Sequence, residues 1–202
     1  MPTSADHVGE EMMEDIAHFC ITWRKRPHWH APGVMYWVTF TALRPRYFSP
    51  PSRDLIMETI LFDNGTRHDL HGCVVMPDHV HMLTMPLRTE KDAKRYWNLG
   101  KLMQSWKIIS AKKVNKHTSS SGSVWKDERH DHIVRDKKQY HQKLSYLLRN
   151  PVKAGLVRRW QEYEWTYLKG YALNRWSKWT RVSEEPSQDD REVGDERSRQ
   201  YS

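Results

Sequence analysis

The chain has 202 residues, which suits one ordinary domain that can bury its own core. Only two cysteines occur, Cys20 and Cys73, which excludes a disulfide scaffold and favours a reducing, intracellular setting. No apolar stretch approaches the length of a membrane span, and the acidic N-terminus lacks the pattern of a signal peptide, so we expect no membrane association.

The formal net charge of +8 is unevenly distributed along the chain. Residues 1–20 contain five acidic residues and no Lys or Arg, and the segment from Trp176 onward contains seven acidic and five basic residues. By subtraction, residues 21–175 carry about fifteen excess positive charges, which favours a polyanionic partner. Ten tryptophans accompany this charge, a mixture that suits single-stranded nucleic acid. A basic but inert surface over a tryptophan-rich core is the alternative.

We divide the chain into an acidic arm (1–20), a folded domain (21–175) and a polar tail (176–202) that is expected to be disordered. Within the domain, aromatic and β-branched residues predict strands over 36–43, 70–76, 79–85 and 132–135. Helices are predicted over 52–63, capped by Ser52, over 89–116, and from Asp136 to a point before Pro151. The order β-α-β-β-α-β with a further helix predicts an α+β, ferredoxin-like (split βαβ) fold, with an antiparallel sheet and helices packed on one face.

The predicted strand 79–85 carries a histidine pair, His79 and His81. Side chains two apart on a strand share a face, so two imidazoles can converge on one divalent cation. Taken alone the pattern is weak, since twelve histidines are present and paired strand histidines are common on surfaces. The preceding Asp78 is interpreted as a turn residue, with a supporting contact to the histidines as the alternative.

The predicted helix after Asp136 has an apolar stripe on one side, formed by Tyr140, Leu144, Leu147 and Leu148. Tyr146 lies off this stripe by roughly 100° or more at about 100° per residue. Asn150 follows one turn later on the same polar side. An aromatic residue displaced from the core face is available for chemistry, although a tyrosine that partly covers a neighbouring element has the same pattern.

Four signals now stand in a fixed order: MPDHVHML, Trp125, a His-Ile-Val-Arg strand, and Tyr-x-x-x-Asn-Pro-Val-Lys-Ala-Gly-Leu-Val. Together with the lead-in PHWHAPGVMYWVTF, they resemble the REP-associated tyrosine transposases. These are single-tyrosine members of the HUH endonucleases, related to the transposases of single-stranded insertion sequences. The resemblance covers roughly residues 25–172.

The resemblance implies that Tyr146 is a nucleophile, that His79 and His81 ligate a divalent metal, and that Asn150 is a third ligand. An amide oxygen suits Mg²⁺ or Mn²⁺ better than a closed zinc site. The implied activity is metal-dependent nicking and strand transfer of single-stranded DNA at REP-like hairpins, through a covalent phosphotyrosine. We expect a bacterial, cytoplasmic, nucleoid-associated protein that is a monomer rather than a dimer.

Other readings of the same residues remain open. A hairpin-binding module without catalysis would use the same fold. His68, His71 and Cys73 could join the histidine pair in a zinc site. A zinc hydrolase is a further alternative. The segment 130–132 could also bind metal or be a charged strand edge. Lysines outside the apolar stripe of helix 89–116 are expected to contact DNA phosphates, or to form a solvated face: Lys101, Lys107, Lys112 and Lys113.

Overall fold

A computed structural model describes residues 33–43, 47–127, 130–171 and 175–176. The expected acidic arm and, apart from Trp176, the expected polar tail lie outside the described residues. Within the described part, no helix is long and apolar enough to cross a membrane.

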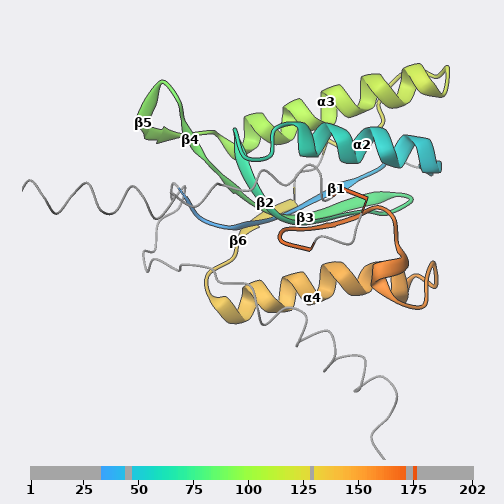
Figure 1. Cartoon of the computed structure of the whole chain (residues 1–202). Helices are drawn as coiled ribbons and strands as arrows, with labels where there is room; N and C mark the ends of the chain where they lie inside the picture. The colour runs from blue at the N-terminus through green and yellow to red at the C-terminus, as the bar shows by residue number, and fades with distance from the viewer. Residues whose placement is uncertain (1–32, 44–46, 128–129, 172–174, 177–202) are drawn as a thin grey trace, which may run out of the picture.

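Five strands form one antiparallel sheet in the order β6-β1-β3-β2-β7 (Figure 1). Their bounds are β1 Tyr36–Thr41, β2 His68–Val75, β3 His79–Pro86, β6 His130–Ile133 and β7 Thr166–Leu168. The first four strands in chain order, β1, β2, β3 and β6, have the arrangement of a split βαβ unit, with β3 between β1 and β2. The predicted α+β, ferredoxin-like antiparallel sheet is therefore confirmed.

The helices cover both faces of the sheet, which corrects the expectation of one covered face (Figure 1). Helices α2 (Pro50–Phe62) and α3 (Leu99–His117) pack on one face, against Val80 and Met82 of β3. Helix α4 (Lys137–Lys153) packs on the other, against Leu83 of β3. Both faces of the central strands are apolar, so a helix on a single face would leave the other face in water.

Helix α4 lies close to the sheet at Gly72 of β2. A Cβ atom on Gly72 would stand 3.0 Å from Cδ1 of Leu144, closer than ordinary contact. Tyr140, Leu144, Leu147 and Leu148 are all fully buried, as the predicted apolar stripe requires. This close packing holds α4, and with it Tyr146, next to the strands.

Several predicted boundaries were wrong for local reasons. Residues 88–96 form a two-stranded hairpin, β4 (Arg88–Thr89) and β5 (Asp92–Tyr96), and α3 begins only after Asn98, whose side chain caps it. Helix α2 is capped by Ser49 rather than Ser52, with two prolines in its first turn. Helix α4 continues through Pro151, because the N–H of Ala154 donates to the carbonyl of Asn150 at 2.9 Å and closes a further turn.

Candidate active site

His79 and His81 lie on β3 and alternate with residues that face α2 and α3. Val80 and Met82 are buried in the core between the sheet and these helices. The period of two along a strand therefore turns both histidines toward the α4 face, as their spacing predicted. Their ring centroids are 4.7 Å apart.

Each of these histidines uses one ring nitrogen to bind a neighbour. Nδ1 of His79 lies 2.6 Å from Oδ1 of Asp78, and Nδ1 of His81 lies 2.9 Å from Oγ1 of Thr39 on β1. Asp78 stands in the turn before β3, so it acts both as a turn residue and as a partner of His79. No other hydrogen bond of either ring is formed within the described ranges, so both Nε2 atoms remain available as ligands.

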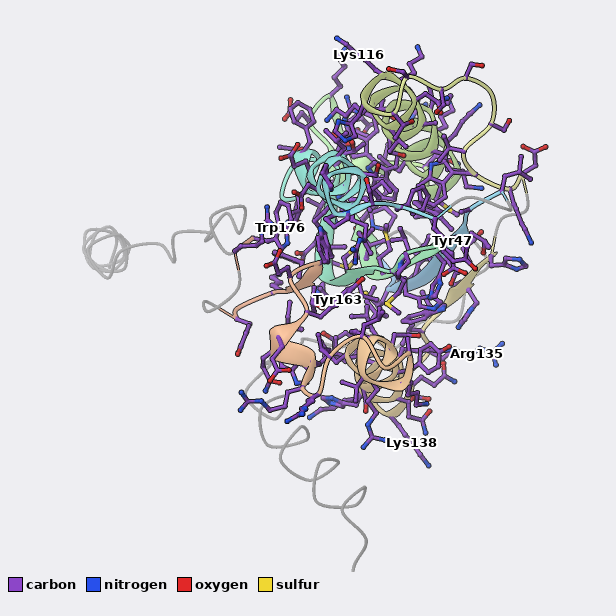
Figure 2. The ribbon with its side chains drawn as sticks, turned by 90° about the vertical axis from the view of Figure 1, so that its right-hand side faces the viewer. Tyr47, Lys116, Arg135, Lys138, Tyr163 and Trp176 are labelled. Atoms are coloured by element: carbon purple, nitrogen blue, oxygen red, sulfur yellow. The ribbon has the colours of Figure 1, made fainter. Side chains whose placement is uncertain are left out.

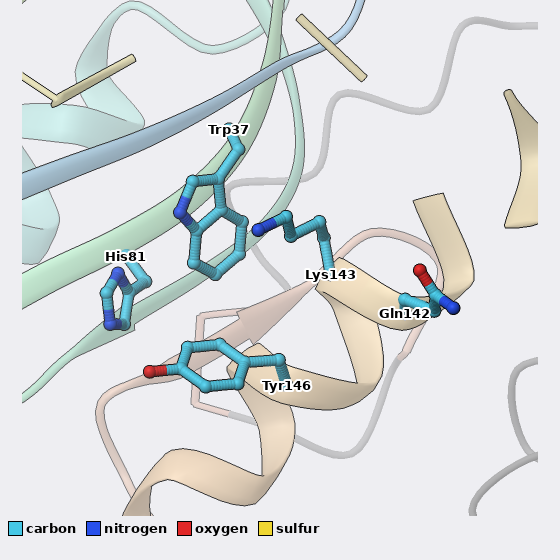
Figure 3. Close-up of a pocket in the computed structure, with 5 residues that line it drawn as sticks. All are labelled: Trp37, His81, Gln142, Lys143 and Tyr146. Carbon is cyan, nitrogen blue, oxygen red and sulfur yellow. The ribbon is translucent and has the colours of Figure 1, made fainter. Parts of the chain in front are cut away.

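Tyr146 projects from helix α4 toward this pair of histidines. Its ring centroid is 5.5 Å from that of His81 and 5.7 Å from that of Trp37. Figure 3 shows the phenol ring extending from α4 toward β3, with its hydroxyl on the side of His81. The Tyr146 side chain is 44% exposed, whereas Tyr140 on the same helix is fully buried. A phenol in this position is open to a substrate and adjacent to the histidines.

A pocket of about 320 Å³ opens beside Tyr146 (Figure 3). It is lined by residues of β1, β3 and α4: Trp37, His81, Gln142, Lys143 and Tyr146. Trp37 stacks on the His81 ring with centroids 4.8 Å apart, and the Lys143 Nζ lies 5.2 Å from the centroid of the Trp37 ring. The indole thus contacts both the lysine and the imidazole.

The environment keeps the His81 imidazole neutral at ordinary pH. Its pKa is lowered to about 3, chiefly by burial and then by the neighbouring charges of His79 and Lys143, against an opposite effect of Asp78. A neutral imidazole is the form that ligates a metal ion.

Asn150 lies one turn after Tyr146, as predicted, and its Nδ2 donates to the carbonyl oxygen of Tyr146 at 3.1 Å. Because the amide nitrogen is used, the oxygen is the atom that remains for a ligand. Imidazole nitrogens and an amide oxygen are donor types that suit a divalent cation. Within the described ranges, no group of three or more His, Cys, Asp or Glu is placed to hold a metal ion.

The alternative zinc ligands are occupied by protein partners. Both ring nitrogens of His68 are used, by Oγ1 of Thr84 at 2.6 Å and the Ile60 carbonyl at 3.0 Å. Those of His71 contact the Tyr140 hydroxyl and an Asp69 carboxylate oxygen, each at 3.2 Å. Burial raises the pKa of the Cys73 thiol and so disfavours the thiolate that zinc requires. These three residues are therefore structural.

The lysines proposed from the sequence as DNA contacts belong to α3, which lies across the sheet from α4, the helix that carries Tyr146 (Figure 1). Lys107 donates from its Nζ to the Lys126 carbonyl at 2.9 Å, Lys101 and Lys112 are exposed, and Lys113 is half-buried. The structure does not bring these lysines to the site around Tyr146.

The sequence interpretation missed four residues of the site. Lys143 and Lys153 stand three residues before and seven after Tyr146, a helical spacing that was visible in the sequence. Trp37 and Thr39 come from β1, and no local signal connects them with β3. Thr39 pairs directly with His81 in the strand register, so only the sheet identifies it.

Comparison with known proteins tests the resemblance to the REP-associated tyrosine transposases independently. No protein-family model matches the sequence. A REP-associated tyrosine transposase from Escherichia coli (strain K12) is 27% identical over 100 residues, which is 49% of this chain and 52% of that protein. The chain thus spans about half the length of the curated relative it matches.

A solved structure shows the same fold. The structure of a REP-associated tyrosine transposase bound to a REP hairpin superposes with a TM-score of 0.53 and 19% identity, over 71% of this chain and 82% of that one. A putative transposase from Deinococcus radiodurans is more distant, with a TM-score of 0.39 and 18% identity over 61% of this chain and 95% of that one. The resemblance of this chain to the REP-associated tyrosine transposases is therefore confirmed by a curated relative and by the fold.

Proposed function

We propose that the protein nicks and rejoins single-stranded DNA at hairpin sequences, with Tyr146 as its nucleophile. One observation carries this proposal: the exposed Tyr146 ring from α4 and the His81 ring from β3 stand 5.5 Å apart on the same face of the sheet. A relative of known fold is bound to a REP hairpin, which supports hairpin DNA as the substrate class. The residues of this site that the structure describes come from a single chain, so we propose that a monomer suffices for one cut.

Tyr146 would act by direct displacement at phosphorus. Its phenolic oxygen, having lost its proton, attacks the phosphate and forms a P–O bond, while the bond from phosphorus to the 3′ oxygen breaks. The departing 3′ oxygen takes up a proton and becomes a free hydroxyl. The DNA keeps a 5′-phosphotyrosine link, and a later attack by a 3′ hydroxyl reverses the step. Because one ester replaces another, rejoining requires no ATP.

The residues around Tyr146 fit a divalent cation, Mg²⁺ or Mn²⁺. His79, His81 and Asn150 would hold it through the two free Nε2 atoms and the amide oxygen, whose present partners leave these atoms available. Such an ion would polarise the scissile phosphate and stabilise the charge that develops on it. Asp78 and Thr39 would hold the two imidazoles in the tautomer that presents Nε2.

The proposal is tested with single-stranded hairpins, with unpaired flanks, taken from the DNA beside the protein's own gene. The wild-type protein with Mn²⁺ is expected to nick them and to form a covalent adduct that resists denaturant. Mass spectrometry of the trapped adduct should place the nucleotide on Tyr146.

Tyr146→Phe keeps the ring and removes only the hydroxyl. This variant is expected to fold and bind the hairpin as wild type does, without nicking or adduct formation. Tyr47→Phe is the matched control, since Tyr47 is also exposed but is not among the residues that line the pocket. Full nicking by Tyr146→Phe would refute the nucleophile assignment. Binding by the wild type with no nicking in any divalent metal would instead favour a hairpin-binding module without catalysis.

A further inference from the structure

Four polar or aromatic side chains form a second stripe along α4. Lys143, Tyr146, Asn150 and Lys153 stand at relative positions −3, 0, +4 and +7, so they lie on one side of the helix. This stripe is separate from the apolar stripe that packs on the sheet. Tyr146 is therefore flanked along the helix axis by one lysine on each side.

Both lysines are held toward the site by aromatic rings rather than by carboxylates. The Lys143 Nζ lies 5.2 Å from the centroid of the Trp37 ring, and the Lys153 Nζ lies 5.4 Å from that of Tyr146. Neither ammonium forms a salt bridge with any residue in the described part of the chain. Two positive charges beside the nucleophile thus lack an ion-pair partner among the residues that the structure describes, which is the property expected of a site for an anion.

The positions of the two lysines on α4 set the direction of that anion. Their Cα atoms are ten residues apart, which is about 15 Å of helix, and Tyr146 lies between them. A stacked single strand advances about 3.4 Å per nucleotide, so a strand that runs along α4 presents several phosphates over this length. Such a strand can offer one phosphate to each ammonium group, with Tyr146 facing the linkage between them.

We propose that Lys143 and Lys153 bind two different backbone phosphates of the single-stranded DNA, one on each side of the phosphate that Tyr146 attacks. The single strand then lies along α4, and the two ion pairs centre the scissile linkage on the phenol. This inference rests on the proposed function, because it takes Tyr146 as the nucleophile. It adds the path of the strand and the two phosphate contacts.

The test replaces each flank phosphate in turn by an uncharged methylphosphonate in the hairpin oligonucleotide defined above. Binding is measured in metal-free buffer, so that the strand stays intact. With wild-type protein, we expect weakened binding at one position on each side of the cleaved linkage. Lys143→Ala should lose the effect at one of these positions and Lys153→Ala at the other. Each variant should also lower the salt dependence of binding by about 0.7 in log–log slope.

Lys138→Ala is the matched control. Lys138 belongs to the same helix but points away from the sheet, as Figure 2 shows, so this variant should keep both methylphosphonate effects. Lys143→Arg and Lys153→Arg should keep them as well, because the positive charge is retained. Identical scans for wild type, Lys143→Ala and Lys153→Ala would overturn the inference while leaving the nicking activity standing. Absence of binding and of nicking in the wild type would overturn the proposed function together with the inference.

Discussion

Each face of the central sheet buries a histidine against a tryptophan, but the two histidines differ in their hydrogen bonds. On the α2/α3 face, His68 is fully buried and packs on Trp106, with both ring nitrogens bonded inside the protein. On the α4 face, His81 is also buried and packs on Trp37, but only its Nδ1 has a partner within the described ranges. The state of the ring nitrogens, rather than burial or an aromatic neighbour, therefore separates a structural histidine from a candidate ligand.

The largest expected contrast between the faces is in catalysis. His81→Ala and His79→Ala should lower the rate of single-turnover nicking by about 10³-fold or more, since Lewis-acid stabilisation is worth several kcal/mol and about 1.4 kcal/mol is tenfold. Hairpin affinity should change little in variant protein that remains folded. Nicking rates with Mn²⁺, measured beside thermal unfolding, check this. Nicking at the wild-type rate by either variant, or in excess chelator, would remove the metal from the mechanism.

On the opposite face, the expected effect is on stability. Trp106→Ala removes a ring that is 1% exposed and leaves Asp63 Oδ2 without the 3.2 Å hydrogen bond from the indole. The free energy of unfolding should fall by about 3–5 kcal/mol, the usual cost of such a truncation. Urea denaturation measures this loss. A cost below about 1 kcal/mol would show that the core on this face repacks around the cavity.

The pH dependence of stability offers a finer test of the same face. Burial lowers the pKa of His68 to about 4, so between about pH 6.5 and 4 the unfolded chain binds a proton that the folded protein excludes. Stability is therefore lost as the pH falls, by about 2 kcal/mol between pH 7 and pH 5 from this group. Urea denaturation at the two pH values should show a smaller pH effect in His68→Gln. An equal pH effect in both proteins would contradict the assignment of this pH dependence to His68.

The smallest expected effect concerns the lysines of α3. Because α3 lies across the sheet from Tyr146, any phosphate that Lys112 or Lys113 binds belongs to a part of the hairpin remote from the scissile linkage. Lys112→Ala and Lys113→Ala should each lower the salt dependence of hairpin binding by at most about 0.9 in log–log slope, without changing the nicking rate of bound DNA. A large loss of nicking by bound DNA in either variant would place the strand on the α3 face.

Local periodicity was enough to predict much of this protein. The alternation on β3 placed His79 and His81 on one face, and the helical stripe of α4 separated buried Tyr140 from exposed Tyr146. These predictions succeeded because each depends on residues within a few positions of one another, where chain geometry alone fixes which side chains share a face. The order of the elements likewise predicted the antiparallel split βαβ arrangement.

Tertiary structure decided which elements meet. Placing α4 alone on the second face brings Tyr146 to His81, and the pairing of β1 with β3 brings Thr39 to the same ring. These contacts join residues far apart in sequence, so their formation depends on strand register and on which apolar surface each helix covers. The short strand β7 was missed for the same reason, since its three residues become a strand only by pairing with β2.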